Sequence, residues 1–249
     1  MGKARKERGA ERRPGRQPPP STDGLELDAR RSQRLQTRAL LQNSRTPLQV
    51  IQIAEHAGTL AEQAIEQAIR QSPPRRPFTC REGCAWCCHK TVGTSAPEVI
   101  RIAAFLRERL STEQWEALRE RIRQRDEQRR TLLHHDPWAA ARLPCALLVD
   151  NRCSVYPVRP LTCRGYNSSD AAACEQSVRS RGRVEVPLYA PQQRLTTFVL
   201  DGLCAGLTES GLKGERLELT AALRVSLTIP DATERWLAGE AIFAEARLP

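Results

Sequence analysis

Aromatic residues are scarce in this chain, and it has no long apolar run. Only 4% of its 249 residues are Phe, Trp or Tyr, and its apolar residues are mostly Ala, Leu, Ile and Val. This mixture favours helices over sheets. No apolar stretch approaches the ~20 residues that a membrane-spanning helix needs. We therefore predict a helical protein that does not enter a membrane.

An export signal is also missing from the sequence. No apolar segment follows the basic residues at the start of the chain, and Arg12 and Arg13 lead into Pro14 and Gly15. Secretory and twin-arginine signals both need such a segment, so we expect a cytoplasmic protein. Lysine is rare as well: of 39 basic residues only four are Lys. This skew, together with abundant Ala, is typical of a GC-rich bacterial genome.

Nine cysteines are present in this chain. Disulfides do not persist in a reducing cytoplasm, so clustered cysteines there usually bind metal ions or carry out redox chemistry. An exported protein with disulfides is the alternative, but nine is an odd number and no export signal is visible. We therefore interpret the cysteines as metal ligands.

Half of the net charge of +10 lies at the start of the chain. Residues 1–16 carry seven basic and two acidic side chains, and residues 1–24 are polar and rich in Pro and Gly. A basic tail can bind nucleic acid by releasing counterions, but this tail has no aromatic residue on which bases would stack. We predict a disordered basic tail at 1–24, and leave a protein or nucleic-acid partner for it as an unsupported alternative.

Helical patterns fill most of residues 25–249, which we predict to form a single α-rich domain. The first pattern begins at Leu25 and breaks near Asn43 and Ser44, and the second begins at Pro47, a residue suited to a first helical turn. Small apolar residues recur along this second helix: Val50, Ala54, Ala57, Ala61, Ala64 and Ala68. Such a stripe predicts close packing on a partner helix.

Capping boxes mark two further helices. The residues Ser95 to Glu98 and Ser111 to Gln114 both have the pattern, and the second starts a charged helix that runs to about Leu133. We expect the helices within about 96–133 to form an antiparallel pair that closes over the cysteines. Later helices are expected at about 191–209, at about 215–229 and after Asp231.

A small hairpin is the β element that the sequence predicts. The runs 146–149 and 153–156 are β-prone, and Asp150 and Asn151 between them are typical of a tight turn. A loop-rich stretch then extends to Pro187. The expected fold class is therefore predominantly α: an irregular helical domain with a small β-hairpin and cysteine-rich metal-binding loops.

Four of the cysteines lie within nine residues. Cys80, Cys84, Cys87 and Cys88 form the pattern C-x3-C-x2-C-C. Cysteines this close together in a tight turn can direct their sulfurs to one ion, and Gly83 can adopt the positive φ that such turns need. The first segment strongly indicates metal binding.

Four more cysteines follow in a second segment. Cys145 and Cys153 would lie near each other if the hairpin strands pair, and the turn at Pro157 and Pro160 would bring Cys163 back towards them. Cys174 comes next. The ninth cysteine, Cys204, lies in an apolar helical pattern and is interpreted as a small buried hydrophobic residue.

Together these motifs resemble a known family. Cys84-x2-Cys87-Cys88, followed by Cys153-Ser-Val-Tyr-Pro-Val-Arg-Pro-Leu-Thr-Cys163-Arg-Gly-Tyr166, is similar to the YkgJ-type CxxCxxCC cysteine-cluster family. Its members are described as zinc- or iron-chelating proteins and sometimes as iron–sulfur oxidoreductases. The resemblance covers a cysteine-cluster core at about 78–175. Cys174 matches a downstream cysteine that members often carry, whereas Cys80 departs from the family pattern because its spacing is x3 instead of x2.

The flagellin lysine N-methylases resemble this family too. They share the cysteine cluster and use S-adenosylmethionine. No glycine-rich nucleotide loop is visible in this chain, so the methyl-transfer activity is not carried over.

The adjacent cysteines constrain any site. Neighbouring side chains diverge, so Cys87 and Cys88 fit two metal centres, or one polynuclear centre, better than a single mononuclear site. Eight cysteines suit two Cys₄ zinc sites, or a cubane iron–sulfur cluster plus a zinc. The predicted cofactor is zinc or an iron–sulfur cluster. Its predicted ligands are Cys80, Cys84, Cys87, Cys88, Cys145, Cys153, Cys163 and Cys174.

Four polar residues lie between the ligands of the second segment. Arg159 and Arg164 would donate hydrogen bonds to thiolates and offset their charge. Tyr156 and Tyr166 would either do the same or pack against the site.

The leading function is metal binding by a cysteine cluster in which both segments share one core. Two alternatives remain: an iron–sulfur oxidoreductase or methyl-transferring enzyme, and a zinc-stapled interaction module that recruits a partner through its tail. No catalytic residue set identifies a substrate.

Overall fold

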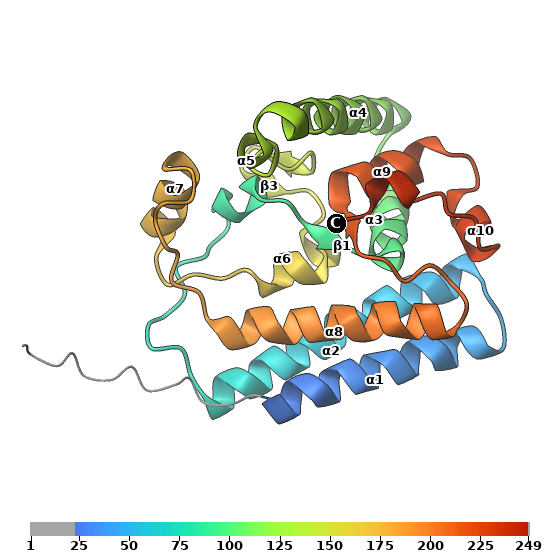
Figure 1. Cartoon of the computed structure of the whole chain (residues 1–249), viewed down its shortest axis with the longest axis horizontal. Coiled ribbons are helices and arrows are strands. Elements are labelled where there is room, and N and C mark those ends of the chain that lie inside the picture. Colours follow the sequence, from blue (N-terminus) through green and yellow to red (C-terminus); the bar gives the residue numbers. More distant parts are fainter. Residues whose placement is uncertain (1–22, 249) are drawn as a thin grey trace, which may run out of the picture.

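The computed structural model describes residues 23–248 (Figure 1). The predicted disordered tail at 1–24 lies almost entirely outside these residues. Helix α1 (Asp23–Gln42) begins two residues before the expected start at Leu25. The predominantly α fold is confirmed, since long helices dominate and the strands are two residues long. None of the helices within 23–248 is long and apolar enough to span a membrane.

Three long helices form one layer of the molecule. In Figure 1, α1, α2 (Pro47–Gln71) and α8 (Ala190–Glu209) lie along one side, and α1 and α8 are in the most extensive contact. At Gly202 of α8 a Cβ atom would lie only 2.2 Å from the carbonyl oxygen of Arg30. The two helices therefore touch through their backbones. The predicted small-residue stripe of α2 is buried as expected.

Two helices begin at the predicted capping boxes. α3 (Ala96–Arg109) starts after Ser95, and α4 (Thr112–His135) starts after Ser111. Within the described residues they do not form the expected antiparallel pair. Instead α3 packs on α2 and α9 (Leu219–Thr228), and α4 also packs on α9.

The composition of α4 explains this difference. Most of its side chains are polar or charged, and only a narrow strip at Leu118, Ile122 and Asp126 is buried. Asp126 Oδ2 accepts a hydrogen bond of 2.7 Å from Arg224 Nε of α9. An ionic contact with α9, rather than an apolar face on α3, therefore positions α4.

The structure contains two small antiparallel sheets. The predicted hairpin is present as β2 (Leu148–Val149) and β3 (Arg152–Cys153), with Leu148 opposite Cys153. Asp150 and Asn151 both have positive φ, as a two-residue hairpin turn requires. The second sheet, β1 (Gly93–Thr94) with β4 (Leu217–Glu218), was not predicted.

Several short elements also differ from the sequence prediction. The helix expected at 215–229 begins only at Leu219, because β4 occupies its first residues. The expected loop stretch contains two helices, α6 and α7, and Asp170 caps the second by accepting the Ala173 N–H. The remaining short elements are η1 (Trp86–His89), α5 (Pro137–Ala140), η2 (Tyr156–Val158), α6 (Leu161–Gly165), α7 (Ala171–Arg179), α10 (Ala232–Leu237) and η3 (Ala244–Ala246).

Candidate metal centre

The cysteines predicted to bind metal lie on loops and short elements between the helices. Cys87 and Cys88 are on η1, Cys153 is on β3, Cys163 on α6 and Cys174 on α7. The other three, Cys80, Cys84 and Cys145, are in loops. All nine cysteines have free thiols.

Backbone hydrogen bonds hold the two cysteine segments together. The N–H of Thr79 donates to the carbonyl of Ser168 over 2.8 Å, and the N–H of Cys145 donates to the carbonyl of Cys88 over 2.8 Å. Helix α7 also packs against η1. Residues more than 50 positions apart in the sequence therefore meet at one place.

Four thiols line one pocket, and we call them the outer set: Cys80, Cys84, Cys87 and Cys174. The pocket is open to solvent and has a cavity volume of about 30 Å³, and Trp86, Lys90 and Tyr166 also line it. The backbone N–H of Ser168 donates to Cys80 Sγ over 3.3 Å. Burial raises the pKa of Cys80 and of Cys174, and the neighbouring thiolates of the set raise both further.

The remaining four thiols form a second group, which we call the inner set: Cys88, Cys145, Cys153 and Cys163. Burial raises the pKa of Cys163 well above its usual value, and the charges of Cys145 and Cys153 act in the same direction. Cys145 and Cys153 likewise raise the pKa of Cys88. The four thiols are thus near enough to influence one another. Three of them also pack against the main apolar core: Cys145, Cys153 and Cys163.

Backbone N–H groups face two thiols of the inner set. Burial raises the pKa of Cys145 to about 11, and a hydrogen bond from the N–H of Leu147 opposes that rise. Burial likewise raises the pKa of Cys153, and a hydrogen bond from the N–H of Val155 opposes that rise. Hydrogen bonds to sulfur favour the thiolate form that a metal requires.

Cys87 and Cys88 connect the two sets. A hydrogen bond from the Cys88 thiol lowers the pKa of Cys87 to about 7, and the positive charges of Lys90 and Arg159 lower it as well. The same hydrogen bond raises the pKa of Cys88, which keeps its proton. Cys87 lines the outer pocket, and its charge also raises the pKa of Cys153 and Cys163 of the inner set, so Cys87 lies where the two groups meet.

Among the predicted supporting residues, Arg159 and Tyr166 lie beside the thiols. The charge of Arg159 acts on Cys87 and Cys153, while its guanidinium stacks on the exposed ring of Tyr156 at 3.9 Å. The ring of Tyr166 supports the ammonium of Lys90 at 4.5 Å. Lys90 was missed by the sequence analysis, although a basic residue two positions after Cys88 was a signal that could have identified it.

The side chain of Arg164 makes other contacts. Its guanidinium donates to the carbonyls of Pro157 and Arg159 and forms an ion pair with Glu62 of α2. It thereby fixes the turn between β3 and α6. The expected hydrogen bond to a thiolate is replaced by these contacts.

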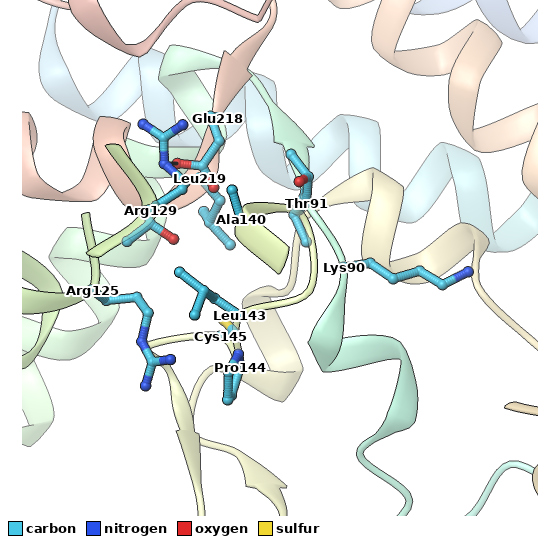
Figure 2. Close-up of a pocket in the computed structure, with 12 residues that line it drawn as sticks. Lys90, Thr91, Arg125, Arg129, Ala140, Leu143, Pro144, Cys145, Glu218 and Leu219 are labelled. Carbon is cyan, nitrogen blue, oxygen red and sulfur yellow. Dashed lines mark ion pairs between the residues drawn. The ribbon is translucent and has the colours of Figure 1, made fainter. Parts of the chain in front are cut away.

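A second pocket, with a cavity volume of about 20 Å³, adjoins the inner set (Figure 2). Of the inner thiols only Cys145 lines it, together with Arg125 and Arg129 of α4. Arg129 Nε lies 3.2 Å from Glu218 Oε2, so its charge is already compensated there. In Figure 2 the Lys90 side chain points away from this pocket, and Lys90 lines the outer pocket as well.

The donor chemistry fits zinc or iron. Thiolates are the ligands that both metals prefer in structural and cluster sites, and the residues that line the outer pocket contain no carboxylate or imidazole. Within residues 23–248, no three Cys, His, Asp or Glu side chains already stand in a ligating arrangement. Metal binding would therefore require the thiols of a set to draw together.

The comparisons with known proteins agree with this chemistry. Residues 79–183 match the model of the CxxCxxCC family, whose description is "putative zinc- or iron-chelating domain". All eight predicted ligands lie within that range, and the family resemblance seen in the sequence is confirmed. No curated protein and no solved structure matches the chain.

Proposed function

We propose that this chain, whose residues 79–183 form a CxxCxxCC domain, binds zinc or iron through its eight clustered thiols. The observation that carries the proposal is that thiols from two distant segments meet in one region, with four of them lining one pocket. Four thiolates complete a tetrahedral zinc site and also ligate an iron–sulfur cluster. Supporting cations are close by, because Lys90 and Arg159 both act on Cys87.

The energetics of the thiols also support metal binding. Burial and mutual repulsion raise the pKa of most of them, so without metal these groups would be protonated and only weakly attractive to one another. The loops that carry them have little secondary structure. A bound metal supplies on the order of 10 kcal/mol of folding free energy at neutral pH, which is enough to organise such loops.

The test is anaerobic purification followed by elemental analysis and an absorption spectrum. We expect at least about one zinc or iron per chain. Visible absorbance together with inorganic sulfide identifies an iron–sulfur centre, and its absence together with zinc identifies Cys₄ zinc sites. The control is Cys204→Ala, which changes the cysteine outside both sets and should keep the full metal content. Less than one metal per chain in the wild type would disprove the proposal.

A second candidate function is an iron–sulfur oxidoreductase. The observation that favours it is the outer pocket, because its thiols lie beside space for a reactant. Reduction of the purified protein by dithionite with bleaching of its visible spectrum would support this activity, and a colourless zinc protein would rule it out. A reducing cytoplasm suits either function, since the thiols must stay unpaired.

A further inference from the structure

The two sets of thiols differ in how they contact solvent. In the outer set Cys80 and Cys87 are exposed, and all four thiols line the open pocket. The inner set has no exposed member, and three of its cysteines pack against the apolar core. A molecule from solution can therefore approach the outer thiols much more easily than the inner ones.

The two sets also differ in how the chain holds them. Cys153 lies in a paired strand, and Ser154 adds two hydrogen bonds to the carbonyl of Leu147. Cys163 follows Leu161, whose N–H donates to the buried carboxylate of Glu98 over 2.7 Å. By contrast, the loop of Cys80 and Cys84 contacts the second segment through hydrogen bonds between residues 79–80 and Ser168 and through an exposed ion pair of Glu82 with Arg152.

The outer pocket is suited to the exchange of ligands on a metal. Its walls are largely apolar, with Trp86, Val186 and Leu188 among them, and Lys90 is its one charged lining residue. The positive charge of Lys90 beside the thiolates offsets part of the negative charge of the site. Thiolate exchange on zinc proceeds by the approach of an incoming ligand, and the open pocket leaves these four thiols accessible from solvent.

We propose that the outer set is an exchangeable site for a thiophilic divalent ion, whereas the inner set keeps a second ion as a permanent part of the fold. This inference rests on the proposed function and assigns different roles to its two groups of ligands. Zinc and ferrous iron are the ions with the appropriate preference for thiolates. The outer site would then acquire an ion from solution or release one to a partner thiol.

The experiment measures zinc release from the full-length zinc-loaded protein to the chromophoric chelator 4-(2-pyridylazo)resorcinol. We expect two zinc ions per chain, with one released rapidly and the other only slowly or after denaturation. Cys174→Ala and Cys80→Ala should each lose the rapidly released ion, retain the other and lower the melting temperature less than Cys163→Ala does. Cys163→Ala should lose the slow ion and lower the melting temperature, and Cys204→Ala should behave as wild type.

The outcomes separate this inference from the function on which it rests. Release of two ions in a single phase, loss of both ions in Cys174→Ala, or binding of a single ion per chain would overturn the division of roles while leaving metal binding intact. An iron–sulfur cluster that needs thiols from both sets would overturn it as well. Failure of the wild type to bind any metal would disprove both the proposed function and this inference.

Discussion

At the scale of single residues, Arg164 decides how the second cysteine segment is held. Its side chain is only 6% exposed, and its guanidinium joins the carbonyls of Pro157 and Arg159 to Glu62 of α2. A buried guanidinium with such partners is costly to remove, because the carbonyls lose their donors. Cys163 precedes this residue directly, so the position of one ligand depends on it.

Replacing Arg164 by Met should lower the free energy of unfolding by about 2–4 kcal/mol, because buried charged hydrogen bonds are lost. Urea denaturation of the metal-loaded protein measures the effect. The control is Arg152→Met on the hairpin, which removes the exposed ion pair between Arg152 and Glu82. It should change stability by no more than about 0.5 kcal/mol. Equal effects in the two variants would contradict the role given to Arg164.

At the scale of elements, two contacts between helices determine the arrangement around the site. The first is the close approach of α1 and α8 at Gly202. The second is the buried Asp126 of α4, which binds Arg129 and Arg130 of its own helix and Arg224 of α9. One contact depends on the absence of a side chain and the other on charge.

The variant Gly202→Ala should destabilise the protein by about 1–3 kcal/mol, because its new methyl group has to push the α1 backbone away. Thermal denaturation followed by circular dichroism measures this effect. Gly24→Ala is the matched control, since a Cβ atom at Gly24 of α1 would have no neighbour within 4 Å. In the control the higher helix propensity of Ala should raise stability slightly. A stabilised Gly202→Ala variant would show that the helices are not in backbone contact.

Asp126 gives a pH-dependent prediction. Burial raises its pKa, but hydrogen bonds from Arg129 and Arg224 and the charge of Arg130 outweigh burial and leave the pKa below its usual value. Because the pKa is lower in the folded state, the carboxylate stabilises the protein above the unfolded pKa of about 3.9. This stabilisation is lost as the pH falls through the folded pKa.

Asp126→Asn should therefore cost about 3 kcal/mol at neutral pH, and the difference from wild type should shrink below about pH 4. Denaturation curves of both proteins across this pH range provide the measurement. Protonation of the cysteines affects wild type and variant alike, so the difference between them isolates Asp126. A difference that does not change with pH would contradict the ionic contact.

At the scale of the whole molecule, the cysteines connect two groups of helices. The layer of α1, α2 and α8 contacts the cysteine-bearing region through α6, which carries Cys163. The other group, formed by α3, α4 and α9, approaches it through Cys145 and the pocket in Figure 2. Metal binding would therefore be coupled to the folding of the whole chain from α1 onwards.

Deletion of residues 1–22 should leave the melting temperature and the metal content unchanged, because this segment is polar, rich in Pro and Gly, and offers no apolar anchor. The variant would still lose half of the net charge, since residues 1–16 carry five of the ten surplus positive charges. Calorimetry and elemental analysis of the truncated protein test this prediction. A large fall in either quantity would mean that the basic segment takes part in folding or in the metal site.

The sequence by itself determined the features that depend on neighbouring residues. The capping boxes at Ser95 and Ser111, the buried stripe of α2 and the Asp150–Asn151 turn all follow from short-range backbone and side-chain preferences. The thiol chemistry of the site also follows from the sequence, because the residue types and their spacing select thiophilic metals.

Only the tertiary structure decided which residues meet. Local patterns do not specify that β4 pairs with β1, that α4 packs on α9 instead of α3, or that Arg164 turns towards α2. The division of the thiols into an outer and an inner set has the same origin. Cys87 and Cys88 are adjacent in sequence and their thiols share a hydrogen bond. Tertiary packing around η1 places Cys174 of α7 in the same pocket as Cys87, and the backbone of Cys145 on that of Cys88. Such pairings depend on contacts between distant segments, whose free energies are set by the packing of the whole chain.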